Sequence, residues 1–238
     1  MNMDPQSALE QSATLMLDMD GTLLDLAFDN YMWKELIPRR YAVANDLAFE
    51  DARELLMSKY EAVQGDLEWY CLDHWCDRLG IDVVQLHHDV SHRIGYLPGA
   101  LNFLREVRGR DVRVLLVTNS HRDTLALKDA MTGLGDYFDG LHSSHDYGHA
   151  KESQQFWDAL QEDVGFDPET TLFVDDSQPV LESARQYGIG MLVTVTQPDT
   201  SAPVIQGSKF RGVERVADML PWKNPTKRGQ SPFGRKGL

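Results

Sequence analysis

The segment from Leu15 to Asp25, with the sequence LMLDMDGTLLD, constrains the fold of this chain more than any other. An apolar run that ends in an acid and is broken by Gly21 is typical of a short buried strand followed by a sharp loop. Asp18 and Asp20 stand two residues apart where this strand ends, and side chains two apart on a strand point the same way. We therefore expect both carboxylates to face one pocket.

Such a carboxylate pair has a chemical use. Two carboxylates this close are hard to keep ionised unless a cation lies between them, and Mg²⁺ prefers hard oxygen ligands together with substrate phosphate. Gly21 and Thr22 add backbone N–H groups and a hydroxyl that could hold an anion. One aspartate can attack phosphorus while its neighbour acts as acid and base. The same residues also fit a plain acidic turn, because Asp and Gly are common turn formers.

The composition limits the class of protein and its partners. With 238 residues, 42% hydrophobic and 25% charged, the chain suits one domain with an insertion or two small domains. No apolar run approaches a membrane span, and the first residues lack the order of a signal peptide, so we expect a cytoplasmic protein without a membrane partner. The net charge of −14 would repel nucleic acid. A small phosphorylated substrate remains compatible with that charge if a metal and a lysine share its pocket.

The sequence favours a structural role for the two cysteines. Cys71 and Cys76 lie five residues apart in a helical pattern. Without a secretory signal, we expect reduced buried thiols rather than a disulfide or a metal pair.

The remaining chain alternates between helical and strand-like patterns. Residues 28–92 have helical spacing with no strand signal, which predicts a helical bundle inserted after the first strand. Strands are expected at residues 14–17, 112–117, 140–143, 171–176 and, as the last strand, 191–195, with helices behind the turn at 96–100 and at 122–132, 151–164 and 180–187. This alternation predicts a doubly wound, Rossmann-like parallel α/β sheet, whose ligands bind at the carboxyl ends of the strands. Residues 1–12 are expected to be a loose leader and residues 221–238 a flexible basic tail.

Three further polar clusters follow elements of this predicted sheet. Thr118 and Asn119 end the second strand and offer a hydroxyl and an amide to a phosphoryl oxygen. Lys151 follows a loop and could neutralise phosphate charge. Asp175 and Asp176 end another strand and add carboxylates for a metal. Taken one at a time, each cluster has a structural explanation. Thr118 and Asn119 could form a common turn, Lys151 could be a surface lysine, and the acid pair could cap a helix. These structural explanations do not account for the fact that all the clusters occur in this order on one predicted sheet.

In this order the motifs resemble those of the haloacid dehalogenase-like (HAD) superfamily, and they stand here as Asp18-Met19-Asp20-Gly21-Thr22, Thr118-Asn119, Lys151 and Asp175-Asp176. The resemblance covers about residues 14–200. It implies a core domain at residues 1–26 and 96–220, and it makes the helical insertion at residues 27–95 look like the alpha-helical cap of the family. Motion of such a cap would exclude water from the closed site.

The same resemblance implies roles for the motif residues. Asp18 would be the nucleophile that forms an aspartyl-phosphate, and Asp20 the general acid and base. Mg²⁺ would be bound by Asp18, the backbone carbonyl of Asp20 and Asp175, with Asp176 binding the metal through water or orienting the loop. The phosphoryl group would be held by Thr118, Asn119 and Lys151.

Other segments look like the proteobacterial GMP/IMP 5′-nucleotidase branch of this superfamily, namely Leu23–Tyr31, Trp69–Trp75, Thr118–His121 and Phe173–Ser177. The acid at position 20 favours phosphate chemistry, because a dehalogenase needs no proton donor two residues after its nucleophile. The branch usually has proline directly before the motif lysine, where this chain has Ala150, and His149 stands where an aromatic is expected. These departures concern the rigidity of the loop and, with it, specificity.

Residues of the predicted cap offer contacts to a nucleoside, and each has a structural alternative. Trp69, Tyr70 and Trp75 could stack on a purine, although aromatic residues at helical spacing also form cores. Three polar residues past the nucleophile loop could meet a sugar or base or cap the first helix, and both readings stay open for Asp25, Asp29 and Asn30.

The leading hypothesis is a Mg²⁺-dependent phosphomonoesterase that hydrolyses purine nucleoside 5′-monophosphates, GMP or IMP, through an aspartyl-phosphate. Its expected partner is this small nucleotide. A HAD sugar-phosphate phosphatase or phosphomutase would use the same site. A catalytically silent phosphate-binding module is disfavoured, because an intact acid pair carries an electrostatic cost.

Overall fold

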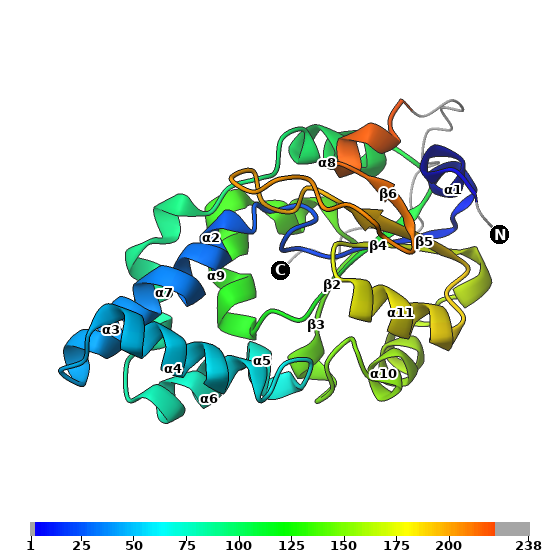
Figure 1. The fold of residues 1–238 in the computed structure, drawn as a ribbon. Coiled ribbons are helices and arrows are strands. Elements are labelled where there is room, and N and C mark those ends of the chain that lie inside the picture. Colours follow the sequence, from blue (N-terminus) through cyan, green and yellow to red (C-terminus); the bar gives the residue numbers. More distant parts are fainter. Residues whose placement is uncertain (1–2, 222–238) are drawn as a thin grey trace, which may run out of the picture.

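The computed structural model describes residues 3–221, and its centre is a sheet of six parallel strands in the order β3-β2-β1-β4-β5-β6 (Figure 1). The strands are β1 (Thr14–Leu17), β2 (Arg113–Thr118), β3 (Gly140–Ser143), β4 (Thr171–Asp175), β5 (Met191–Val195) and β6 (Arg211–Val213). The chain builds β2 and β3 on one side of β1 and the later strands on the other. This confirms the expected doubly wound α/β fold and places its topological switch point at β1, where such folds bind ligands.

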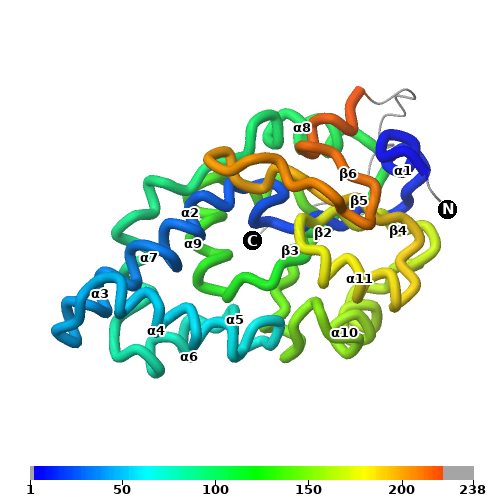
Figure 2. The backbone as a smooth tube through the Cα atoms, in the orientation of Figure 1, coloured from blue at the N-terminus to red at the C-terminus, as the bar shows by residue number. Residues whose placement is uncertain are grey.

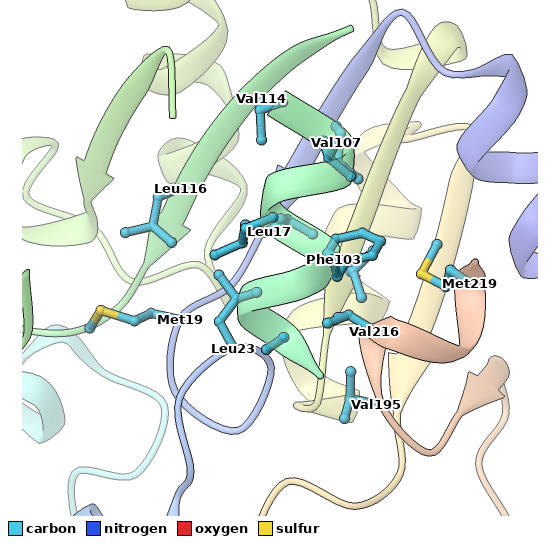
Figure 3. Packing of buried hydrophobic residues seen from close by; sticks show 14 of the residues in the cluster. Leu17, Met19, Leu23, Phe103, Val107, Val114, Leu116, Val195, Val216 and Met219 are labelled. Carbon is cyan, nitrogen blue, oxygen red and sulfur yellow. The ribbon is translucent and has the colours of Figure 1, made fainter. Parts of the chain in front are cut away.

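Helices cover both faces of the sheet. On one face, α8 (Ala100–Arg108) packs with α1 (Pro5–Gln11) and η6 (Val216–Met219), and Figure 3 shows Phe103 and Val107 of α8 among the strand residues Leu17 and Leu116. On the other face lie α10 (Gln154–Val164) and α11 (Gln178–Tyr187). The connections contain α9 (Arg122–Thr132), η3 (Leu134–Tyr137), η4 (Ser144–Asp146) and η5 (Pro168–Thr170).

The central strand is held from both sides because side chains of a strand alternate between its faces. Leu15 and Leu17 of β1 belong to the apolar cluster under α8, whereas Met16 belongs to the cluster under α10 and α11. All three side chains are fully buried. A shift of one residue would exchange these two faces, so the register of β1 is fixed, and with it the position of Asp18, which follows directly.

Residues 27–95, called the helical segment from here on, contain no strand. They form α2 (Ala27–Tyr31), η1 (Met32–Leu36), α3 (Ile37–Ala44), α4 (Phe49–Glu61), α5 (Leu67–Tyr70), α6 (Leu72–Leu79), α7 (Val83–Asp89) and η2 (Ser91–Arg93). An apolar cluster of their own residues, centred on Trp75, Leu56 and Met32, holds these helices together. Figure 2 shows the segment beside the sheet, in the left half of the view.

The start of the chain differs from the loose leader expected at residues 1–12. Asp4 accepts a hydrogen bond from the N–H of Gln6 at 3.1 Å and begins α1, with Pro5 in its first turn. Ala8 and Leu9 of this helix are buried in the core. The sequence does contain the signal, because an Asp followed by Pro is a typical helix start.

The prediction that residues 191–195 form the last strand is wrong, because a further strand, β6, follows β5 in the sheet. Its three residues include Arg211 and Gly212, which give no strand pattern. The helix expected from Lys151 begins only at Gln154. The basic tail expected at residues 221–238 lies, except for Pro221, outside the described residues. No helix within residues 3–221 is long and apolar enough to cross a membrane.

Candidate active site

The carboxyl ends of three neighbouring strands meet at one edge of the sheet. Asp18 follows β1, Thr118 ends β2 and Asp175 ends β4, and β1 lies between the other two strands. These ends open into a cavity of about 490 Å³. The structure brings together in its walls all seven site residues predicted from the sequence, which are Asp18, Asp20, Thr118, Asn119, Lys151, Asp175 and Asp176.

Lys151 places a positive charge at the centre of this edge, and only 2% of it is exposed. Its ammonium donates hydrogen bonds to Oδ1 of Asp18 at 2.5 Å, to Oδ2 of Asp175 at 2.8 Å and to the carbonyl of Val117 at 3.0 Å. Burial by itself would lower the pKa of Lys151, but the two carboxylates outweigh it and raise the pKa. The lysine therefore stays charged, and its three contacts satisfy all three of its donors.

Asn119 fixes the loop that carries this lysine. Its Oδ1 accepts from the backbone N–H of Lys151 at 2.9 Å, and its Nδ2 donates to Oε2 of Glu152 at 2.9 Å. The neighbouring Thr118 is buried, and its hydroxyl accepts from the backbone N–H of Ser120 at 3.0 Å. The amide of Asn119 thus links the end of β2 to the segment before α10, which explains why Lys151 can reach the sheet edge from outside it.

Three carboxylates crowd around one side of the cavity. Oxygens of Asp18, Asp175 and Asp176 lie within 4.8 Å of one another. Burial raises the pKa of Asp18 to about 7, with the negative charge of Asp175 adding to the effect and Lys151 opposing it. The pKa of Asp176 is raised well above its usual value, again by burial and by the two neighbouring acids. One lysine does not neutralise the buried Asp18 and Asp175 together with the half-buried Asp176, so the cluster favours an added cation, and its hard oxygens fit Mg²⁺.

The tight loop after β1 needs its glycine. Gly21 has a φ of +81°, in the left-handed region, and a Cβ there would lie 2.6 Å from Oδ2 of Asp176 and 2.9 Å from Cβ of Pro198. Any side chain would push Asp176 out of the acid cluster. The role considered for the Thr22 hydroxyl is not supported. Thr22 is fully buried and does not line the cavity, and among the described residues its hydroxyl has no hydrogen-bond partner.

Asp20 faces a second buried lysine, which sequence reasoning missed. Lys128 of α9 is 1% exposed, and its ammonium lies 2.6 Å from Oδ1 of Asp20 and 2.8 and 2.9 Å from the two carboxylate oxygens of Asp29. The hydroxyl of Ser120 donates to the other oxygen of Asp20 at 2.6 Å. Burial raises the pKa of Asp29 to about 6, although Lys128 opposes the rise. A lysine in the middle of a helix gives no sequence signal of such a contact.

The three polar residues after the nucleophile loop have different surroundings. Oδ1 of Asp25 accepts from the N–H groups of Ala27 and Thr200 at 3.0 and 3.2 Å, so this residue links the first residue of α2 to the loop after β5. Asp25 does not line the cavity, whereas Asp29 and Asn30 do. The amide of Asn30 donates to Oδ2 of Asp199 at 2.7 Å.

The helical segment contributes a second wall of the cavity, in which Lys34 and Glu61 stand beside five aromatic residues, Trp33, Tyr60, Trp69, Tyr70 and Trp75. Trp75 is only 1% exposed; its indole N–H donates to the carbonyl of Trp69 at 2.9 Å, and its ring meets Tyr60 edge to face at 4.8 Å. It therefore serves as core of the segment. Trp33, Trp69 and Tyr70 are half-buried and keep surface toward the cavity.

A family model for haloacid dehalogenase-like hydrolases matches residues 13–188. The chain belongs to this family. The HAD membership confirms the resemblance read from the motifs, and a curated relative extends it to the nucleotidase branch. The chain is 41% identical to the GMP/IMP nucleotidase YrfG of Escherichia coli (strain K12) over 208 residues, which are 87% of this chain and 94% of that protein.

Solved structures of HAD proteins share the fold. A HAD phosphatase from Thermococcus onnurineus superposes with a TM-score of 0.73 at 19% identity, covering 87% of this chain and 95% of that chain. The L-2-haloacid dehalogenase of Xanthobacter autotrophicus gives a TM-score of 0.60 at 16% identity, with 87% and 96% covered. At these identities the similarity concerns the fold alone.

Proposed function

We propose that this HAD enzyme hydrolyses purine nucleoside 5′-monophosphates, with GMP and IMP as the preferred substrates. One observation carries the proposal: a single cavity joins the acid cluster and Lys151 at the sheet edge to an aromatic wall on the helical segment. The first part suits a phosphoryl group and the second a purine ring, because flat aromatic side chains stack on nucleobases. The similarity to the GMP/IMP nucleotidase supports the same assignment.

In the proposed reaction, a carboxylate oxygen of Asp18 attacks phosphorus, and the bond between phosphorus and the ribose 5′ oxygen breaks. Asp20 gives a proton to the leaving ribose oxygen, so that the free nucleoside departs and an aspartyl-phosphate remains. Asp20 then takes a proton from a water molecule, which attacks phosphorus, releases inorganic phosphate and regenerates Asp18. Both steps balance in atoms and charge. They need an acid and a nucleophile on one side of the cavity, where Asp18 and Asp20 lie.

The remaining motif residues hold the charge of the phosphoryl group. Lys151 and Thr118 would bind its oxygens, and Asn119 would act on it directly or through the loop of Lys151. Mg²⁺ would be held by Asp18, the backbone carbonyl of Asp20 and Asp175, with Asp176 bound through water or orienting the loop. When bound, Mg²⁺ would neutralise the carboxylates and the phosphate oxygens. The carboxylate of Asp20 is engaged by Lys128 and Ser120, which agrees with a metal contact through its backbone oxygen instead.

The helical segment would act as a cap over this site, with domain limits at residues 27 and 95. It contributes the aromatic wall, and it touches the sheet side directly, since the hydroxyl of Tyr70 donates to Oε1 of Glu152 at 2.7 Å. Glu152 also accepts from Asn119. Closure of the segment over a bound nucleotide would exclude bulk water from phosphorus and strengthen each charge interaction there.

The test is phosphate release from GMP, IMP, AMP, UMP, glucose phosphates and phosphoglycolate, each measured with Mg²⁺ and with EDTA. We expect GMP and IMP to react fastest and all activity to stop with EDTA. Faster turnover of a glucose phosphate would overturn the purine assignment and favour a sugar-phosphate phosphatase. Conversion of a sugar phosphate to an isomer without phosphate release would indicate a phosphomutase, and no reaction with any compound would favour a phosphate-binding module.

A further inference from the structure

A second group of potential metal ligands lies where the helical segment meets the sheet edge. It contains Cys71, His121 and His145, whose ligand atoms are all within 4.8 Å of one another. Cys71 stands between α5 and α6, His121 begins α9 behind β2, and His145 lies in η4 behind β3. Three separate segments thus converge on one point, which no spacing in the sequence indicates.

His145 is poised as a ligand. Its Nε2 is buried and has no hydrogen-bond partner among the described residues. A buried ring nitrogen without a partner costs free energy unless another group, such as a metal, meets it. The rings of His121 and His145 lie edge to face at 4.8 Å.

The other two groups have supporting contacts. Nε2 of His121 lies 3.9 Å from a carboxylate oxygen of Asp73, and its Nδ1 accepts from the backbone N–H of Asp123 at 3.3 Å and lies 3.7 Å from a carboxylate oxygen of the same residue. If Nδ1 ligates, it gives up the N–H of Asp123, and Nε2–H then faces the carboxylate of Asp73; a carboxylate beside the second ring nitrogen of a ligating histidine is the usual support of a zinc site. Within residues 3–221, the one hydrogen bond that Sγ of Cys71 accepts is long, at 3.5 Å, and comes from the N–H of His74.

We propose that Cys71, His121 and His145 form a binding site for Zn²⁺ or a similar borderline divalent cation. One thiolate and two imidazoles are typical zinc ligands, with water in the fourth position. Bond lengths of about 2.0–2.3 Å place the ligand atoms of tetrahedral zinc roughly 3.5 Å apart. The limit of 4.8 Å on the observed spacing exceeds this by about 1.3 Å, a difference on the scale of a side-chain rotation. The acid cluster of the active site differs in kind, since its three oxygen ligands favour Mg²⁺.

The site would also connect two parts of the molecule. Cys71 belongs to the helical segment, whereas both histidines follow strands of the sheet. Cys71 and His145 line a further cavity of about 470 Å³, which gives a cation access to them. Zinc held there would restrain the helical segment against the sheet edge and slow turnover. This last consequence, unlike the binding itself, rests on the proposed function.

Binding is tested by titrating the full chain with Co²⁺, a spectroscopic substitute for zinc, in excess Mg²⁺ and under reducing conditions. We expect a thiolate-to-cobalt charge-transfer band that Zn²⁺ displaces, with stoichiometry near one. Cys71→Ser should abolish the band, and His145→Gln should weaken binding at least about tenfold. Cys76→Ser and His88→Gln, both in the helical segment, are the matched controls and should bind as the wild type does. Absence of the band, or its survival in Cys71→Ser, overturns the site.

The restraint is tested separately by phosphate release with and without Zn²⁺ at fixed excess Mg²⁺. If Zn²⁺ slows phosphate release by the wild type but not by Cys71→Ser, the restraint of the helical segment is supported. Equal slowing in both proteins assigns the effect to the acid cluster and overturns the restraint. Because the cobalt titration needs no substrate, a failure of the nucleotidase proposal would leave the result on metal binding unaffected.

Discussion

The two walls of the active-site cavity are built on different physical principles. The sheet-edge wall consists of charged groups whose positions follow from strand ends in fixed register, with Asp18 and Asp175 joined through Lys151 at 2.5 and 2.8 Å. The wall from the helical segment carries five aromatic residues beside charged ones such as Lys34 and Glu61, and its aromatic residues are held by packing against one another, as Trp75 is against Tyr60. The sheet therefore fixes the positions of the reactive groups. The surface that would contact the rest of a substrate depends instead on how the side chains of the helical segment pack. Each prediction below perturbs one wall and measures whether the other is affected.

The largest effect is expected from Asp18→Asn, which removes the proposed nucleophile with little change in shape. Turnover should fall at least about 10⁴-fold for every phosphomonoester, because the loss concerns the reaction itself and not the leaving group. Phosphate release measures this. The control is Asp111→Asn, an exposed aspartate before β2, which should keep full activity. An Asp18→Asn protein that retained a tenth of the wild-type rate would contradict the assignment of the nucleophile.

Lys151→Met tests the charge balance of the same wall. It leaves Asp18 and Asp175 buried without their shared cation, so we expect unfolding to become easier by about 3–5 kcal/mol in the absence of metal. Turnover should fall about 10²–10³-fold. Urea denaturation and phosphate release are the measurements, with the exposed Lys209→Met as control. If Lys151→Met were as stable as the wild type, the carboxylates would have to be protonated or otherwise paired in the folded protein.

His87 tests the stability of the helical segment. It is 2% exposed, its Nδ1–H donates to the carbonyl of Val83 at 2.8 Å, and burial lowers its pKa from 6.5 to about 4. Between these pH values the unfolded chain binds more protons than the folded chain, so stability falls as pH drops from 6.5 toward 4 and is unaffected above 6.5. This group should account for about 3 kcal/mol across that window.

The measurement for His87 is urea denaturation at several pH values, compared between the wild type and His87→Asn, which retains an N–H donor. The variant should lose less stability on acidification than the wild type. His88→Asn, at an exposed neighbouring position, should follow the wild type. Parallel pH curves for the wild type and His87→Asn would show that His87 is not kept neutral by the fold.

The smallest effect is expected from Trp69→Leu, on the aromatic wall. Loss of one stacking ring should raise KM for IMP about tenfold and leave turnover of phenyl phosphate nearly unchanged, because stacking is worth about 1–3 kcal/mol per base. Tyr41→Leu replaces a half-buried aromatic of the same segment outside the cavity and is the control. An equal loss with both substrates would mean that Trp69 supports the fold of the segment rather than the purine.

The sequence predicts the sheet-edge wall far better than its surroundings, for a physical reason. Parallel strands end at a common edge, so polar residues after apolar runs can be assigned to one place, and Asp18, Thr118 and Asp175 all line the same cavity. Lys128 cannot be found in this way, because its contact with Asp20 joins the middle of a helix to a loop. The strand β6 is also missed, because its three residues show no strand pattern and only Val213 among them is buried.

The helical segment shows where periodicity stops being informative. Its helical character follows from the spacing of apolar residues, yet that spacing does not distinguish a core aromatic from one that meets a ligand. Trp75 is fully packed while Trp69, six residues earlier, keeps exposed surface toward the cavity. Leu55 has the spacing of a core residue and is nevertheless 42% exposed. Only the packing of the whole segment decides between these outcomes.

The ion triad of Lys128, Asp20 and Asp29 has a consequence for movement of the helical segment. Asp29 belongs to α2, whereas Lys128 and Asp20 belong to the sheet side. While α2 is in place, the three charges sum to −1; if α2 moves away, Lys128 and Asp20 remain as a neutral pair. Such a movement separates charges held at 2.8 and 2.9 Å in a buried setting, where their attraction is strong. The position of one helix therefore sets the net charge around the carboxylate that would handle the proton.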